Sequence, residues 1–265
     1  MSLEVLVTTL YQEDMSIIGK MNIQTDVVIA NQTNKYALVS DIVNENKAVM
    51  ISTPTRGLSR NRNIALGAAT GELIMFMDDD AVFYNGYEEK VLKVFDEHPE
   101  ADAIRFATTT VAISVAKNLG KTENNPSKFR KATRRELARH GVCGLVIKGE
   151  VLKKYNLHFN ELFGAGTQNY CGEDTIFLQE MAKKKINFYL SPISIASINK
   201  SESTWFDGYN EKYFYTTGKV LATIYPSMAK LLAIRSAYRF SKREIDMSFW
   251  KILSSYWSGI NDCKK

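Results

Sequence analysis

Apolar residues in the first part of the chain form short continuous runs that are separated by segments of helical periodicity. The runs that we expect to be buried strands are 3–9, 26–32, 48–53, 73–77 and 102–107. The segments that we expect to be helices include 59–69 and 86–98. Strands that alternate with helices through short connections are typical of a parallel sheet covered by helices.

Residues 57–83 contain the most informative part of this pattern. Ser59 is expected to open a helix that ends near Gly71, and an apolar strand follows at residues 73–77. A buried parallel strand ends at the edge of the sheet where α/β proteins bind their ligands. The side chains that come directly after residue 77 are therefore expected to face a ligand site.

Three consecutive aspartates, Asp78, Asp79 and Asp80, follow this strand. Adjacent carboxylates repel one another at the edge of a dry sheet, so the arrangement is unfavourable unless a cation binds there. Carboxylate oxygens suit Mg²⁺ or Mn²⁺, ions that keep water and complete their shell with phosphate oxygens. The alternative is an acidic turn that caps the next helix, although a cap needs only one carboxylate. We therefore predict a cation site.

At this point the sequence resembles a known family. The residues that carry the resemblance are Gly57-Leu58-Ser59, Arg62-Asn63, Ala65, Ala68, Gly71-Glu72 and, after the apolar strand, Asp78-Asp79-Asp80. In order and spacing they resemble family 2 glycosyltransferases of the GT-A fold, in particular bacterial enzymes of capsular and exopolysaccharide synthesis. The resemblance implies an α/β fold with a mostly parallel, Rossmann-like sheet, helices on both faces and a C-terminal helical appendage.

The resemblance also implies a division of the chain into three parts. Residues 1–107 would be the nucleotide-sugar-binding half of the GT-A domain, residues 108–205 its acceptor-binding and catalytic half, and residues 206–265 a C-terminal helical extension. A chain of 265 residues suits one domain with an appendage better than two independent domains.

Donor contacts are implied by position within the family pattern. The residues concerned are Thr9, Tyr11, Asn31, Arg62, Asp78 and Asp79, with the metal on Asp78 and Asp80. Tyr11 is expected to contact the nucleotide, with core packing as the alternative, and Asn31 keeps the hydrogen-bonding capacity of an aspartate common in the family. Arg62 lies in the first turn of its helix, where a basic group is mildly unfavourable unless it shares an anion with the helix dipole. The partner is expected to be a diphosphate or a uracil, with a surface ion pair as the alternative.

A second acidic pair, Glu173 and Asp174, follows the glycine-rich residues 162–172. Glycines let the backbone approach a ligand closely, and the pair is expected to open a helix. The family has a Gly-x-Gly loop and a Glu-Asp pair here, one carboxylate of which is the catalytic base, so the resemblance implies Asp174 as the base beside Glu173. The alternative is that the pair only complements the helix dipole.

Two further segments belong to the acceptor side by resemblance. Residues 117–130 are expected to form a mobile loop of the kind that is either a lid or disordered. Some relatives supply a late histidine as a third metal ligand, but this chain has Asn199 and Lys200 there, so water and phosphate oxygens would complete the shell. Trp205 is expected either to stack on a sugar or to lie in the core.

Composition and charge bear on location and partners. The cysteines Cys143, Cys171 and Cys263 form no CxxC pair, which favours a reducing cytoplasm. No apolar run approaches the ~20 residues that cross a bilayer, so we expect a cytoplasmic protein. Basic residues cluster at 128–139 and again from Lys230. Such clusters suit nucleic acid, anionic lipid or a diphosphate, and they are equally expected on a solvated helix.

Aromatic residues alternate with Lys and Arg from residue 205 to the end of the chain. This pattern fits amphipathic helices at the inner face of a membrane or on a partner, and equally helices packed on the domain. We expect no nucleic-acid partner.

The resemblance, with these features, implies a metal-dependent glycosyltransferase, and family membership alone implies that it inverts the anomeric carbon. It would move a sugar from a nucleotide-diphosphate donor, a UDP-sugar, to a saccharide or lipid-linked acceptor in cell-surface polysaccharide synthesis. A metal-dependent phosphatase or nucleotidyltransferase would use the same aspartates. A non-catalytic nucleotide-sugar-binding module is the other alternative.

Overall fold

The structure is a computed structural model that describes residues 1–110, 125–199, 208–243 and 245–263. Its strands are β1 (Leu3–Leu10), β2 (Asp26–Gln32), β3 (Ala37–Val43), β4 (Asn46–Thr53), β5 (Leu73–Asp78), β6 (Ala81–Phe83), β7 (Ala103–Thr110), β8 (Arg130–Lys131), β9 (Leu145–Lys148) and β10 (Phe188–Ile198). Its helices are α1 (Ile17–Lys20), α2 (Leu58–Ala68), α3 (Tyr87–Glu97), α5 (Arg134–Leu137), α6 (Gly149–Lys154), α7 (Glu173–Lys183), α8 (Glu211–Ile224), α9 (Ala229–Phe240) and α10 (Phe249–Asp262).

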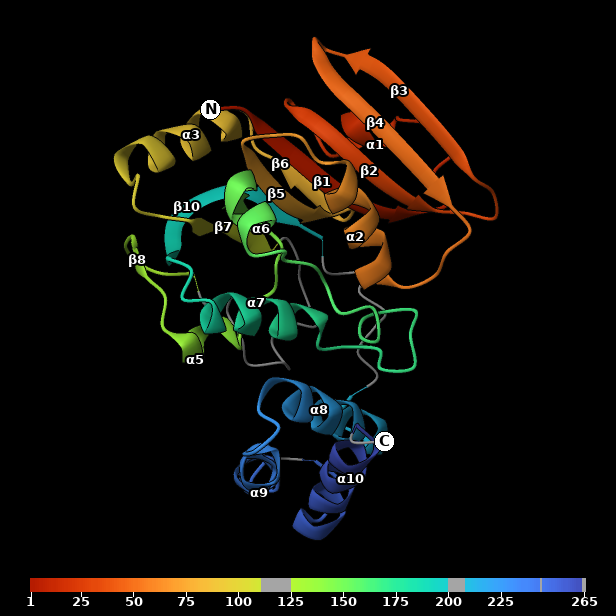
Figure 1. Cartoon of the computed structure of the whole chain (residues 1–265), viewed down its shortest axis with the longest axis vertical. Helices are drawn as coiled ribbons and strands as arrows, with labels where there is room; N and C mark the ends of the chain where they lie inside the picture. The colour runs from red at the N-terminus through yellow and green to blue at the C-terminus, as the bar shows by residue number, and fades with distance from the viewer. Residues whose placement is uncertain (111–124, 200–207, 244, 264–265) are drawn as a thin grey trace.

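The strands of the described ranges form one ten-stranded sheet in the order β3-β4-β2-β1-β5-β9-β7-β10-β6, with β8 paired to β10. The parallel pairs are β1 with β2, β1 with β5, β2 with β4, and β7 with β10. Strands β3, β6, β8 and β9 join in antiparallel orientation. The predicted Rossmann-like arrangement is confirmed, within a sheet that is mixed overall (Figure 1).

Alternate side chains of the central strands face two separate cores. Leu73, Met75 and Met77 pack in a core that includes residues of α1 and α3, whereas Ile74 and Phe76 pack in one that includes residues of α2, α6 and α7. Helices therefore cover both faces of the sheet, as predicted. Burial on both faces explains why β5 has a continuous apolar run instead of an alternating one.

Helices α8, α9 and α10 form a small bundle at the end of the molecule away from the sheet (Figure 1). Phe214 and Tyr256 are buried at its centre. Val220 and Ile224 of α8 pack on Phe163 and attach the bundle to the rest of the chain. The predicted helical appendage is confirmed. Within the described ranges, no helix has the length and apolarity to cross a membrane.

Candidate active site

The carboxyl ends of β1, β2 and β5 bring predicted site residues to one edge of the sheet. Thr9 lies opposite Asn31 in the β1–β2 pair, and Thr8 lies opposite Asp78 in the β1–β5 pair. The Thr9 hydroxyl donates a hydrogen bond to Asp79 at 2.6 Å. The aspartate triplet is therefore held against the end of β1, at the edge that the sequence pattern predicted.

Tyr11 follows β1 with a left-handed backbone, φ 52°, which is uncommon for an aromatic residue. Its side chain is 59% exposed, so the alternative of core packing is wrong. Arg56 donates to the Tyr11 hydroxyl at 3.0 Å, and its guanidinium lies 5.5 Å from the ring centroid. An exposed ring beside a cation, next to the strand ends, is chemically suited to contact a nucleotide base.

Asn31 is fully buried. Its amide oxygen accepts from the Gln12 backbone at 3.0 Å, and its nitrogen donates to the Gln12 carbonyl at 2.8 Å and to Ser52 at 3.1 Å. These bonds fix the turn that presents Tyr11. In the structure Asn31 therefore supports this turn with both of its amide atoms, and its contact with a base stays a prediction.

Arg62 on α2 joins the two acidic clusters. Its guanidinium donates to Asp78 at 2.9 Å and to Asp174 at 2.6 Å, and it lies 3.7 Å from Glu173. The side chain is 3% exposed and lies 5.2 Å from the ring centroid of Phe159. Burial alone lowers the pKa of Arg62, but the three carboxylates outweigh burial and hold the pKa above its ordinary value. Asp78 and Asp174 therefore border one site.

This arrangement gives Arg62 partners within the protein, and its contact with a diphosphate stays a prediction. An anion does lie beside the arginine at the start of α2, as the helix dipole led us to expect, but it belongs to the protein itself. Both ends of the guanidinium are bonded to carboxylates, so its place in the structure is that of an internal bridge. Arg60, on the same turn, pairs with Glu161 at 2.9 Å on the surface.

Asp174 is held by a second contact as well. Its other carboxylate oxygen accepts the backbone N–H of Val142 at 3.2 Å. A Cβ added at Gly141 would lie 3.0 Å from the same oxygen, so only glycine leaves that approach clear. The Asp174 side chain remains 26% exposed. The carboxylate is thus fixed in direction yet accessible from one side, as a group that accepts a proton from a substrate needs to be.

Glu173 lies in a different environment from its neighbour. Its side chain is 13% exposed. Burial and, next, the charge of Asp174 raise the pKa of Glu173 to about 7, although Arg62 opposes the shift. Near neutral pH, Glu173 is therefore partly protonated. When two neighbouring carboxyl groups lie in different environments, one can stay protonated and act as an acid while the other stays ionised and acts as a base.

The glycine-rich loop before Glu173 packs against the start of α2. Gly164 and Gly166 have positive φ values of 109° and 82°, and a Cβ on them would lie 3.2 Å from the Ser59 hydroxyl and 3.3 Å from Gly57, respectively. The Ser59 hydroxyl donates to the Phe163 carbonyl at 2.6 Å, and the N-cap of α2 is Gly57 and not Ser59. The predicted glycine contact with a ligand is thus corrected: these glycines let two backbone segments meet, which brings Asp174 within reach of Arg62.

The aspartate triplet fits a divalent ion that takes few ligands from the protein. Asp78 is shared with Arg62, Asp79 accepts from Thr9, and Asp80 is half-buried at the turn into β6. Within the described residues, no group of three or more His, Cys, Asp or Glu side chains is arranged to hold a metal. Asp78 and Asp80 would leave most positions of Mg²⁺ or Mn²⁺ to water and phosphate oxygens, which these ions accept.

Some site residues were not predicted, and some predictions cannot be placed. Phe159 and Cys143 were missed. The Cys143 thiol donates to Asp78 at 3.7 Å, and burial raises its pKa well above the ordinary value, so it is a neutral neighbour. No local sequence signal marks either residue.

Residues 117–124 of the predicted loop, with Lys200 and Trp205, lie outside the described residues.

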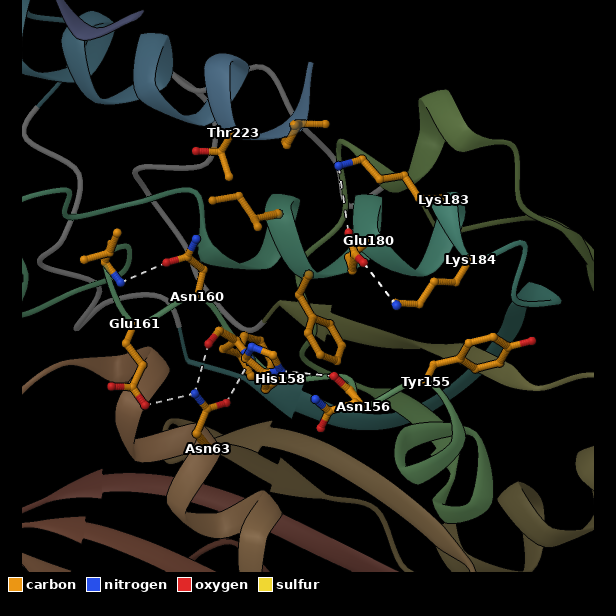
Figure 2. Close-up of a pocket in the computed structure, with 15 residues that line it drawn as sticks. Asn63, Tyr155, Asn156, His158, Asn160, Glu161, Glu180, Lys183, Lys184 and Thr223 are labelled. Atoms are coloured by element: carbon orange, nitrogen blue, oxygen red, sulfur yellow. Dashed lines mark hydrogen bonds and ion pairs between the residues drawn. The ribbon is translucent and has the colours of Figure 1, made fainter. Parts of the chain in front are cut away.

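A cavity of about 730 Å³ is formed by other residues (Figure 2). None of the predicted site residues lines it; its lining is Asn63, Tyr155, Asn156, residues 158–162, Ile176, Phe177, Glu180, Lys183, Lys184, Thr223 and Ile224. Glu180 in its wall is paired with Lys183 and Lys184 at 3.8 and 3.4 Å. Phe159 lines the cavity and also contacts Arg62, so the two places are neighbours. The convergent carboxylates nevertheless lie at the strand ends, and we place the active site there.

The chain is similar to known proteins in sequence and in fold. Residues 27–147 match the family model of Glycosyl transferase family 2. The crystal structure of S. aureus TarS 1-349 in complex with UDP-GlcNAc is similar, with a TM-score of 0.64 and 17% identity over 93% of this chain and 74% of that chain. S. aureus TarS itself gives a TM-score of 0.62 and 16% identity, covering 92% of this chain and 44% of that chain. TarS 1-349 in complex with UDP gives a TM-score of 0.59 and 16% identity, covering 97% of this chain and 71% of that chain.

No curated protein sequence matches the chain. The structural similarity and the sheet topology together show the GT-A fold that the resemblance implied. With the family-model match, they identify the chain as a glycosyltransferase.

Proposed function

We propose that the chain transfers a sugar from a UDP-sugar to a hydroxyl group of a saccharide or lipid-linked acceptor, with inversion at the anomeric carbon. The observation that supports this most strongly is the bridge from Asp78 through Arg62 to Asp174, which places both acidic clusters at one site. The similar TarS structures are complexes with UDP-GlcNAc and with UDP, which supports a uridine donor.

Residues 1–107 would form the donor side of the site. Tyr11 would contact the base from its exposed position beside Arg56. Asp78 and Asp79 would contact the ribose, with Thr9 holding Asp79 in place. Asp80 and Asp78 would hold Mg²⁺ or Mn²⁺, which when bound neutralises charge on the diphosphate.

Residues 108–205 would form the acceptor side, with Asp174 as the base. Asp174 takes the proton from the acceptor hydroxyl, and the oxygen attacks the anomeric carbon while the bond from that carbon to the diphosphate oxygen breaks. The bonds from Arg62 and Val142 keep the carboxylate directed at the site. Glu173 supports this geometry from its buried position, and UDP leaves with the electron pair of the broken bond.

We place this reaction in the synthesis of a capsular or exopolysaccharide, in the cytoplasm. The resemblance of residues 57–80 to bacterial enzymes of that kind supports the pathway, and the three cysteines without a CxxC pair support the compartment.

A thermal-shift screen of nucleotide-sugars, with and without Mn²⁺, tests the proposal. UDP-GlcNAc with Mn²⁺ should raise the melting temperature, because ligand at 100 times its Kd stabilises the native state by about 2.7 kcal/mol. Products should then be UDP and a glycosylated acceptor. Release of pyrophosphate or inorganic phosphate would indicate a nucleotidyltransferase or phosphatase instead. Binding without turnover on any acceptor would indicate a binding module, and no stabilisation by any nucleotide-sugar would contradict donor binding.

A further inference from the structure

Helix α9 has one face in the bundle core and one face in solvent. Ala229, Ala233 and Ala237 are fully buried against the neighbouring helices. Three residues of this kind at intervals of four define a single stripe along the helix, and their small size lets α9 pack closely. This inner stripe explains why α9 belongs to the bundle, but it leaves the opposite face without a packing partner among the described residues.

The opposite face of α9 exposes large apolar side chains. Leu231 is 63% exposed, Ile234 40% and Tyr238 58%. Their spacing of three and four residues places them side by side on the outer face. A single exposed leucine is ordinary on a protein surface, but a row of three opposite a packed stripe is an apolar surface that favours contact with something else.

The charged residues of the segment that contains this surface have one sign. Residues 228–243 contain Lys230, Arg235, Arg239, Lys242 and Arg243, and no aspartate or glutamate. Arg235 follows Leu231 by four positions, so the two share the outer face, and Lys242 lies just beyond the end of α9. The Lys242 ammonium lies 5.2 Å from the centroid of the Tyr238 ring. The outer face of α9 is thus apolar along its centre and basic around it.

We propose that α9 binds in the plane of a membrane that contains anionic lipid. Leu231, Ile234 and Tyr238 enter the boundary between headgroups and acyl chains, while Arg235 and Lys242 contact lipid phosphates. A second copy of the chain fits this surface less well, because two such faces would bring together basic segments that have no acidic residue between them.

The position of α9 in the molecule is compatible with such binding. Figure 1 shows α9 and α10 at the end of the molecule away from β3 and β4, where a flat surface reaches them without meeting the sheet. Trp250, at the start of α10, is 74% exposed and adds a second large aromatic at this end. Tryptophan and tyrosine are enriched at membrane interfaces because their rings are amphipathic.

Co-sedimentation of the full chain with lipid vesicles tests this inference. The probe is a phosphatidylcholine vesicle with about 30% phosphatidylglycerol, compared with phosphatidylcholine alone. The chain should bind the anionic vesicles, bind neutral ones at least tenfold more weakly, and dissociate from the former as salt is raised. Each basic residue near an anionic surface contributes about fivefold, so Arg235→Glu with Lys242→Glu should weaken binding by at least roughly 25-fold. Leu231→Ser with Tyr238→Ser should weaken it by at least tenfold.

Matched variants elsewhere provide the controls. Leu38→Ser with Ile42→Ser removes side chains that are 72% and 66% exposed on β3, and Lys90→Glu with Lys93→Glu reverses two exposed charges on α3. Both controls should bind vesicles as the unmodified chain does. All variants should melt within about 2 °C of it, and vesicle binding needs no nucleotide-sugar, so the outcome is independent of the proposed function.

Three outcomes would overturn the inference. The first is an unmodified chain that does not bind the anionic vesicles. The second is α9 variants that bind as tightly as the controls. The third is a dimer in solution that the α9 variants abolish while no vesicle binding is seen, because the surface would then belong to a second copy.

Discussion

Asp78 and Asp174 accept hydrogen bonds from the two ends of one guanidinium group, that of Arg62, at 2.9 and 2.6 Å. Asp78 is the last residue of β5, whereas Asp174 lies in the first turn of α7. Carboxylates this close to one another would repel without a cation between them. Arg62 therefore does more than neutralise charge: it fixes the relative position of the two acidic clusters.

Replacing Arg62 by methionine should strongly destabilise the protein. The change leaves the partly buried Glu173 and Asp174 without their cation, and loss of one partner of a buried ion pair costs about 3–5 kcal/mol. Urea unfolding measures the effect. Arg60→Met is the matched control, because Arg60 lies on the same turn of α2 as Arg62 but pairs with Glu161 on the surface. Loss of that exposed ion pair should cost less than about 1 kcal/mol. Equal losses in the two variants would contradict the bridging role of Arg62.

Replacing Glu173 by glutamine should change how stability depends on pH. The pKa of Glu173 is raised from 4.5 to about 7 in the folded state. A carboxyl group whose pKa is raised by folding contributes stability at pH values below its pKa in the unfolded chain. That contribution is lost as the pH rises through its pKa in the folded protein. Glutamine does not ionise, so Glu173→Gln should be more stable than the unmodified chain at about pH 8, by about 1–3 kcal/mol, and the difference should disappear near pH 4.5.

Melting temperatures across this pH range check the prediction. Glu150→Gln, an exposed carboxylate on α6, should change stability by less than about 0.5 kcal/mol throughout. A Glu173→Gln variant that gained no stability at alkaline pH would show that folding does not raise the pKa of Glu173.

Replacing Asp80 by alanine should remove the dependence of turnover on Mg²⁺ or Mn²⁺. The remaining activity should be at least about 100-fold below that of the unmodified enzyme, because a metal contributes several kcal/mol of charge stabilisation. Adding a chelator to the unmodified enzyme should reproduce this level, and Asp41→Ala, an exposed aspartate on β3, should leave turnover unchanged. Undiminished turnover in Asp80→Ala would remove the metal assignment.

Replacing Gly259 by alanine should loosen the C-terminal bundle. A Cβ at Gly259 would overlap the Tyr215 carbonyl where α10 crosses α8, and one at Gly218 would overlap the Tyr256 carbonyl. Forcing the helices apart should cost about 1–3 kcal/mol, measured by thermal unfolding. Gly67→Ala is the control, since nothing lies within 4 Å of its Cβ in α2, and it should stabilise by about 0.5–1 kcal/mol. A Gly259→Ala variant as stable as Gly67→Ala would contradict the close helix crossing.

The strands of the central sheet were predictable because they are buried on both faces. β2 has the predicted bounds, and β5 extends one residue beyond them. Strand β3 was missed because most of its side chains are exposed and its sequence has neither an apolar run nor an alternating pattern. The only local sign of the β3–β4 hairpin is the pair Asn44 and Glu45, which adopt positive φ values of 49° and 69°.

The candidate site was predictable in its residue types but not in their partners. The aspartate triplet and the Glu-Asp pair could be located because each follows a recognisable local pattern. The internal partners of Arg62 and Asn31 were not predicted, because Asp174 and the Gln12 backbone are brought close to them only by tertiary packing. No periodicity in the chain encodes a contact of that kind.

The most direct test of a shared active site compares donor binding with turnover in Asp174→Asn. Asparagine keeps the size of the side chain and an oxygen for the Val142 N–H, but it does not accept a proton. Calorimetry with UDP-GlcNAc and Mn²⁺ should give a Kd within about threefold of the unmodified enzyme, while kcat for UDP release falls by about 10²- to 10⁴-fold. Turnover at the unmodified rate, or loss of donor binding in parallel with turnover, would contradict Asp174 as the base of this site.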